Sequence, residues 1–153
     1  MNIYCTEEFF KEYNKLLKKK SYNKLDQDLI SYFFENDIDQ ISTGINLNQD
    51  QEKPFIKKRI SGSGGFRIYF YLIISDQKAY LTFVHPKTGS IGSDNLKKES
   101  IARLQKEILQ NIKSNDLYKL TVKVTELETQ NDKKINKALN FKKLKIKKAL
   151  ASK

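Results

Sequence analysis

The sequence predicts an α+β fold, in which a small antiparallel β-sheet carries an N-terminal helical hairpin packed on it and a further C-terminal helix. Apolar residues recur every three or four positions in segments 6–33 and 94–112, which is typical of amphipathic helices. Between them, residues 66–74 alternate between apolar and other side chains, which indicates a strand with one buried face. A chain of 153 residues has room for one core of ordinary size.

The first third of the chain is expected to form a short strand and two helices. Residues 2–5 suit the strand, and Thr6 suits an N-cap because its hydroxyl can accept a hydrogen bond from a free amide of the first turn. The first helix should reach about Lys19, and a second should cover residues 25–33 after a short polar break. Because the break is short, we expect the second helix to fold back on the first.

The middle of the chain is expected to form the sheet. Residues 36–54 are polar and irregular, and residues 55–60 suit a strand. The strand at 66–74 is followed by a polar turn, and residues 79–85 form a second apolar run of strand length. The two runs therefore predict an antiparallel hairpin. The apolar residues on one face of its first strand are Phe66, Ile68, Phe70, Leu72 and Ile74.

The last part of the chain divides into a helix, a strand and a basic tail. Ser93 or Asp94 can cap a helix that reaches residue 112, and residues 117–124 alternate like a strand. Residues 131–153 are rich in Lys and carry scattered apolar side chains. We therefore predict one domain over residues 1–130, followed by a Lys-rich tail or helix over residues 131–153.

The net charge of +11 favours a polyanionic partner, but its distribution weakens that indication. Residues 131–153 contain nine Lys and one Asp, a charge of +8, so residues 1–130 carry 20 basic and 17 acidic side chains, a charge of only +3. The chain contains 26 Lys and only three Arg, a ratio that an AT-rich genome produces without selection for any ligand. Charge alone is therefore weak evidence for nucleic-acid binding.

Other features exclude several classes of protein. No apolar stretch approaches the roughly 20 residues that span a bilayer, so we expect no membrane association. The single cysteine, Cys5, can form neither an internal disulfide nor a cysteine zinc site, which fits a cytoplasmic protein. The glycine-rich segment 61–65 lacks the residues of a nucleotide-binding loop and leads into a strand, not a helix. We therefore expect no cofactor and no metal.

The most informative segment is the predicted hairpin with its flanking residues. A basic run at 57–59, Lys-Lys-Arg, precedes a Ser-Gly-Ser-Gly-Gly turn at 61–65 and the strand Phe-Arg-Ile-Tyr-Phe-Tyr-Leu at 66–72. The next strand reads Tyr-Leu-Thr-Phe-Val-His-Pro-Lys at 80–87. Over roughly residues 2–112, this pattern resembles the RelE/HigB-like toxins of the RelE/ParE superfamily, found in bacterial type II toxin–antitoxin systems.

This resemblance implies a RelE-like fold, with helices packed on one side of a small antiparallel sheet. It also implies a function, because many members are metal-independent ribonucleases that cut messenger RNA in the ribosome and are neutralised by a cognate antitoxin. The implied partners are therefore an antitoxin protein, mRNA and the ribosome. A subgroup instead inhibits DNA gyrase, so a ParE-like gyrase inhibitor is one alternative. A non-catalytic nucleic-acid-binding protein of the same fold is another.

The resemblance also assigns roles to residues of the hairpin. Arg67 would hold the scissile phosphate, and Lys87 matches a basic position that follows the second strand. His85, the only histidine, is the candidate general acid or base because its unperturbed pKa lies near neutrality. The predicted catalytic residues are Arg67, His85 and Lys87. The predicted RNA-binding residues are Lys57, Lys58, Arg59, Tyr69 and Tyr71, the two tyrosines as platforms for stacked bases.

Each role has a structural alternative. A single histidine at a strand end is more often an ordinary polar residue than a catalytic one. Arg67 lies in an apolar strand and needs a partner, which could be a phosphate or a carboxylate. Tyr69 and Tyr71 could pack against another element as readily as they could stack on bases. The basic run at 57–59 could be a solvated strand edge.

The pairing register of the hairpin decides whether Arg67 and His85 act together. If Ile74 pairs with Ala79, His85 falls opposite Ile68 on the apolar face and Arg67 points to the other face. A slip of one residue reverses this arrangement. The sequence leaves both registers open.

Overall fold

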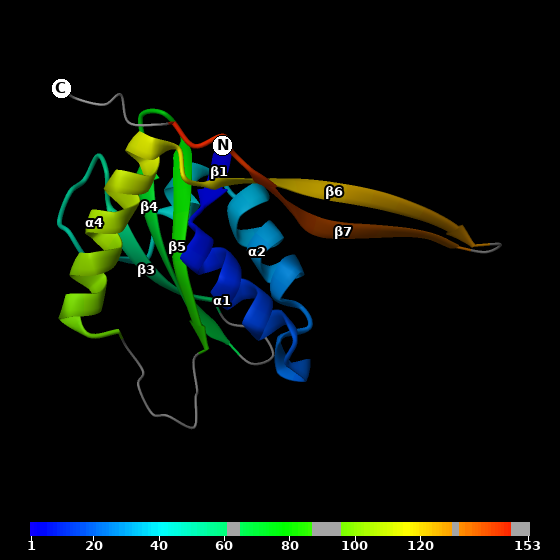
Figure 1. Ribbon diagram of the computed structural model, residues 1–153. Helices are drawn as coiled ribbons and strands as arrows, with labels where there is room; N and C mark the ends of the chain where they lie inside the picture. Colours follow the sequence, from blue (N-terminus) through cyan, green and yellow to red (C-terminus); the bar gives the residue numbers. More distant parts are fainter. Residues whose placement is uncertain (61–64, 87–95, 130–131, 148–153) are drawn as a thin grey trace.

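The structure, a computed structural model, describes residues 1–60, 65–86, 96–129 and 132–147. At its centre is a seven-stranded mixed sheet with the order β2-β3-β4-β5-β1-β6-β7 (Figure 1). The strands are β1 (Asn2–Cys5), β2 (Ile45–Asn46), β3 (Phe55–Ile60), β4 (Phe66–Ile73), β5 (Lys78–Pro86), β6 (Tyr118–Thr129) and β7 (Asp132–Lys143). The helices are α1 (Glu7–Leu17), α2 (Leu25–Phe34), α3 (Ile38–Ile41) and α4 (Lys98–Ser114), with a 3₁₀ turn, η1 (Lys20–Tyr22), between α1 and α2.

Local signals in the sequence correctly predicted where several elements begin. The side chain of Thr6 accepts a hydrogen bond from the backbone N–H of Phe9 at 3.1 Å, which confirms the predicted N-cap of α1. The predicted second helix is present as α2, and the strands predicted near residues 55, 66 and 79 are β3, β4 and β5. Among the described parts of the chain, none of the helices is long and apolar enough to cross a membrane.

The predicted architecture, however, is wrong. The sheet is neither small nor purely antiparallel, because it has seven strands and β1 pairs with β5 in parallel. The helices do not form an N-terminal hairpin on one side of a small sheet. Instead, α1 and α2 lie on one face and α4 on the other (Figure 1).

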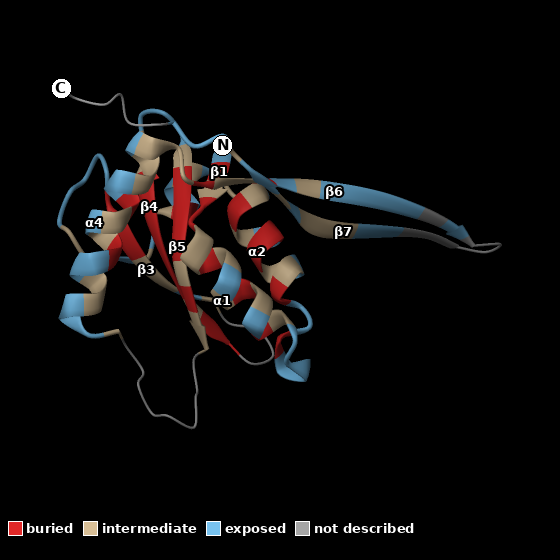
Figure 2. Ribbon diagram, viewed as in Figure 1, coloured by how far each residue is buried: buried red, intermediate tan, exposed pale blue. Residues whose placement is uncertain are grey.

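The physical reason for two helical layers is that the central strands are apolar on both faces. Figure 2 shows β4 and β5 as the most continuously buried strands. On the α1 and α2 side, Ile68 and Phe70 pack with Phe9 and Phe33. On the α4 side, a second cluster contains Phe55, Tyr69, Tyr71, Tyr80, Leu104 and Ile108. A single helical layer would leave this second cluster in water.

Strands β6 and β7 form a two-stranded ribbon that extends beyond the body of the molecule (Figure 1). β1 pairs with β6 only as far as Leu120, and the outer part of the ribbon is exposed (Figure 2), including Val124 at 55% and Ile135 at 61%. Residues 132–143, where a helix or tail was predicted, are a strand because Leu139 and Phe141 pack on the core beside α1. Their spacing of two residues suits a strand.

Candidate functional site

A bulge in the β4–β5 hairpin determines which face His85 occupies. From Ile73 opposite Lys78 to Phe70 opposite Leu81 the pairing is regular, but the next pair is Tyr69 with Phe83. Thr82 is therefore the extra residue of a β-bulge. The hydroxyl of Thr82 donates a 2.8 Å hydrogen bond to the backbone oxygen of Tyr69, which holds the bulge in place.

Because of this bulge, His85 lies directly opposite Arg67. Without it, regular pairing would set His85 opposite Phe66, on the face that packs against α1 and α2. The register with Ile74 opposite Ala79 does not occur, since Ala79 pairs with Leu72. Arg67 and His85 therefore share one face of the sheet.

Arg59 extends this pair into a row across three strands, because it lies opposite Arg67 on β3. We call Arg59, Arg67 and His85 the basic row. Directly opposite residues in antiparallel strands have Cβ atoms about 4.5–5.5 Å apart, so the three side chains are close neighbours. Two guanidinium groups at this separation repel each other, which favours an anion between or above them.

The charges of the basic row are not neutralised within the described residues. Neither Arg59 nor Arg67 takes part in any of the ion pairs formed there. The Nη1 atom of Arg67 is buried and has no hydrogen-bond partner among the described residues. A buried guanidinium nitrogen without an acceptor is costly, so this group is poised to bind an anion such as a phosphate.

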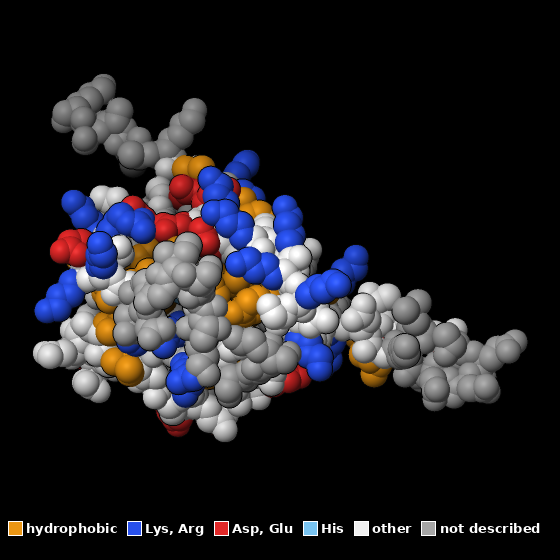
Figure 3. All heavy atoms as spheres, turned by 90° about the horizontal axis from the view of Figure 1, so that it is seen from below, with side chains coloured by type: hydrophobic (Ala, Val, Ile, Leu, Met, Phe, Trp, Pro, Cys, Tyr) orange, Lys and Arg blue, Asp and Glu red, His pale blue; other side chains and the backbone are white. Residues whose placement is uncertain are grey.

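A groove of about 410 Å³ opens beside the basic row. Its described walls come from β3 and β4 and from the segment leading into β2, and these residues contribute cationic groups but no carboxylate. Figure 3 shows this end of the molecule, with Lys and Arg side chains spread around it. The residues that line the groove are Thr43, Gly44, Ile45, Lys57, Lys58, Arg59 and Arg67.

The imidazole of His85 is oriented by its neighbour. Its Nδ1 lies 2.7 Å from the backbone oxygen of Pro86. A carbonyl oxygen only accepts hydrogen bonds, so Nδ1 carries the hydrogen in this contact. In the neutral ring, Nε2 is then an acceptor that can take a proton from a bound substrate.

The predicted base-stacking residues are buried beneath α4. Tyr69 is 0% exposed and Tyr71 is 9% exposed, and both belong to the cluster that contains Leu104 and Ile108. Burial raises the pKa of the Tyr69 phenol, and the Leu96 backbone N–H and the charge of Arg67 lower it to a smaller extent. In this conformation neither ring offers a face to an RNA base.

The other predicted site residues are arranged around the groove. Lys57 lines the groove on the same face as the basic row, because it pairs with Tyr69. Lys58 lies on the opposite face of β3, where its Nζ contacts the hydroxyl of Thr43 at 3.2 Å and lies 6.0 Å from the ring centroid of Tyr32. Lys87 lies outside the described residues.

Phe83 is a candidate that the sequence alone did not suggest. It is half-buried and lies two residues before His85, with the ring centroids 6.2 Å apart. It also lies opposite Tyr69, on the face of the basic row. Its ring is therefore the aromatic group best placed to contact a base next to His85. The signal in the sequence is that Phe83 and His85 are two residues apart, which places them on the same face of a strand. Only the bulge shows that this is also the face of Arg67.

Gly44 sets the shape of the groove by allowing close approach to β3. A Cβ atom at this position would lie 2.5 Å from Cγ2 of Ile56 and 2.6 Å from the backbone oxygen of Lys57. We expect Gly44→Ala to lower the free energy of unfolding by about 1–3 kcal/mol, the usual cost of overpacking. Urea denaturation measures this change, and Ile45→Ala, at a neighbouring position that is 58% exposed, is the control. Equal stability of both variants would contradict the close approach.

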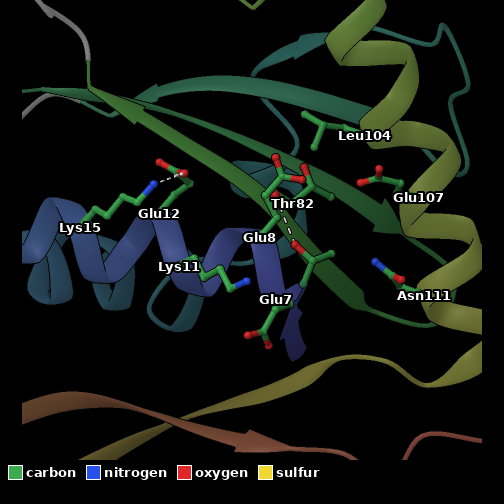
Figure 4. A pocket seen from close by; sticks show the side chains of 10 residues that line it. Glu7, Glu8, Lys11, Glu12, Lys15, Thr82, Leu104, Glu107 and Asn111 are labelled. Carbon is green, nitrogen blue, oxygen red and sulfur yellow. Dashed lines mark hydrogen bonds and ion pairs between the residues drawn. The ribbon is translucent and has the colours of Figure 1, made fainter.

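A second cleft, of about 350 Å³, lies between α1 and α4 (Figure 4). Four of the charged side chains that line it form ion pairs. Arg103 of α4 contacts Glu8 at 2.9 Å and Glu107 at 2.9 Å, and Lys15 contacts Glu12 at 3.3 Å. With carboxylates and ammonium groups mixed and paired, this cleft is a weaker candidate for an anionic ligand than the groove beside the basic row.

Two comparisons with known proteins found no relative of this chain. No protein-family model matches the chain. A search of curated proteins also gives no match. The assignment of function therefore depends on the residues of the basic row and on their chemistry.

Proposed function

We propose that this protein is an endoribonuclease that cuts messenger RNA in the cytoplasm, in the manner of the RelE/HigB-like toxins that its hairpin resembles. The observation that carries the proposal is the basic row, in which the bulge at Thr82 aligns a proton-transfer group with two guanidinium groups. The proposal includes the ribosome as the setting of the reaction and a cognate antitoxin as the inhibitor.

The proposed reaction uses the 2′-hydroxyl of the RNA as its nucleophile. Nε2 of His85 accepts the proton of this hydroxyl, the 2′-oxygen bonds to phosphorus, and the bond from phosphorus to the 5′-oxygen breaks. The products are a 2′,3′-cyclic phosphate and a 5′-hydroxyl, whose proton comes from a second acid. Lys87, which matches a basic position of the toxins that the hairpin resembles, is our candidate for that acid.

The arginines have a separate role, which is to stabilise charge. Negative charge develops on the phosphoryl oxygens as the five-coordinate transition state forms. Arg67 can bond two of these oxygens through its fork of N–H groups, and Arg59 adds positive charge from the next strand. The unpartnered Nη1 of Arg67 fits this role, since it has no competing bond to break within the described residues.

The alternatives predict different biochemistry. A gyrase inhibitor needs a surface for gyrase but no acid or base, and a non-catalytic binding protein needs only the cationic groove. The half-buried imidazole, whose Nδ1 is bonded to the Pro86 oxygen, favours the ribonuclease because neither alternative uses this group.

The chemical form of the product tests the proposal. We expect the purified protein, incubated with an actively translating ribosome preparation and a defined mRNA, to release fragments that end in a 2′,3′-cyclic phosphate. Mass spectrometry of the fragments identifies their ends. Intact mRNA together with loss of gyrase supercoiling activity would contradict the proposal in favour of the gyrase alternative.

A further inference from the structure

A separate pocket lies at the other end of α4 from the basic row. It has a volume of about 370 Å³ and is formed by β1, β5, β6, the C-terminal end of α4 and the segment after β7. In Figure 1, this end of the molecule holds the N-terminus and the start of β5, whereas the basic row lies toward the end of β5. The pocket is therefore distinct from the groove beside Arg67.

An aromatic pair and a lysine line the sheet side of this pocket. Tyr80 on β5, Tyr4 on β1 and Lys119 on β6 are cross-strand neighbours. The rings of Tyr4 and Tyr80 are stacked, with centroids 5.2 Å apart and planes inclined by 17°. Nζ of Lys119 lies 5.9 Å from the ring centroid of Tyr4.

The pocket is cationic, and its described lining residues include no carboxylate. Lys78, Lys119 and Lys147 come from three separate segments and contribute three ammonium groups. None of the three forms an ion pair with a described carboxylate. Lys142, directly opposite Lys119, adds positive charge on the same face.

The hydroxyl groups of Tyr4 and Tyr80 can donate hydrogen bonds, as the ammonium groups can. Burial raises the pKa of Tyr80 to about 12, with smaller contributions from Tyr4, Asp76 and Tyr71. The Tyr80 hydroxyl is therefore protonated at neutral pH and able to donate. A pocket whose charged lining residues are three lysines, with tyrosine hydroxyls beside them, is suited to an oxyanion.

We propose that this pocket binds the phosphate group of a nucleotide or of an RNA strand. Three ammonium groups match the charge and the oxygens of a phosphate, and the volume lies within the range of about 300–1,000 Å³ that is typical of small-ligand sites. This inference rests on the residues of the pocket and does not require the chain to cut RNA.

The test is a comparison of two triple variants of the full chain. Lys78→Gln, Lys119→Gln and Lys147→Gln are combined in one protein, and Lys18→Gln, Lys53→Gln and Lys106→Gln in a control with the same loss of charge. The control lysines are exposed and do not line the pocket. The probes are a 12-nucleotide 2′-O-methyl RNA, which lacks the nucleophile for cleavage, and adenosine monophosphate.

For the RNA probe, we expect the pocket variant to bind about tenfold more weakly than the control at 100 mM salt. The slope of log K against log salt should fall by about 0.7, which is the contribution of one phosphate contact with single-stranded nucleic acid. Fluorescence anisotropy measures both quantities. Calorimetry measures the affinity for adenosine monophosphate. If the pocket variant loses affinity for this nucleotide but not for the RNA, the site is supported with a free nucleotide as its ligand.

A third variant separates binding from folding. With all three lysines replaced by arginine, charge and donors are kept, so affinity should be restored. Thermal melting followed by circular dichroism checks that each variant is folded. If both probes bind the pocket variant and the control equally well, the inference is overturned. Because neither probe reports cleavage, this result would leave the proposed ribonuclease activity untouched.

Discussion

Replacing Arg67 by alanine is expected to slow RNA cleavage by about 10²- to 10³-fold, which is the usual effect of removing one donor to transition-state charge. The loss should appear mainly in kcat, since Arg67 is proposed to stabilise charge that develops only as the 2′-oxygen attacks. Arg67→Lys should recover part of the rate, because it keeps the charge but loses the two-pronged geometry. Single-turnover cleavage of a defined mRNA on ribosomes measures these rates.

The matched control is Arg103→Ala. Arg103 lies on α4, and its guanidinium is already paired with Glu8 and Glu107. Its loss removes the same charge from the protein without touching the basic row, so cleavage should stay within about twofold of the parent rate. An equal loss of activity in both variants would show that total charge, not the position of Arg67, determines the rate. A fully active Arg67→Ala protein would remove the basis of the proposed mechanism.

Sequence reasoning succeeded where the signal was local. The hydroxyl of Thr6 caps α1 as predicted, because a capping bond spans only three residues. The alternation that predicted β4 is likewise contained within the strand. The helix signal around Leu29 and Phe33 correctly located α2, but it did not reveal that α4 would cover the opposite face of the sheet.

The remaining features depend on contacts between distant segments. Strand β7 exists because β6 pairs with it along its whole length and because Phe141 packs on Phe10 and Tyr13 of α1. Those contacts outweigh the helix propensity of the Lys residues in β7.

The bulge at Thr82 has no glycine to mark it. The bulge keeps Val84 in the cluster beneath α1 and places His85 opposite Arg67. Both placements depend on the pairing of β5 with β4, so the sequence of β5 alone does not reveal them.

The burial of Tyr69 leads to the second prediction. Tyr69→Ala should lower the free energy of unfolding by about 3–5 kcal/mol, as expected when a large buried aromatic side chain is truncated. Tyr69 is completely buried among Leu104, Ile108 and neighbouring aromatic residues, so the change leaves a cavity between β4 and α4. Guanidinium denaturation followed by circular dichroism measures the loss. Leu109→Ala, on α4 but 50% exposed, should cost far less.

Tyr69→Phe then separates the two roles considered for this residue. The phenylalanine ring fills the same space, and the hydroxyl that it lacks makes a long contact, 3.4 Å from the backbone nitrogen of Leu96. If Tyr69 is a core residue, Tyr69→Phe should retain most of the stability and all of the RNA affinity. If Tyr69 instead stacks on a base, Tyr69→Ala would weaken RNA binding by about 1–3 kcal/mol while leaving unfolding unchanged. We expect a loss of RNA affinity of this size from Phe83→Ala instead. Phe83 is half-buried, and its ring neighbours His85 on the face of the basic row.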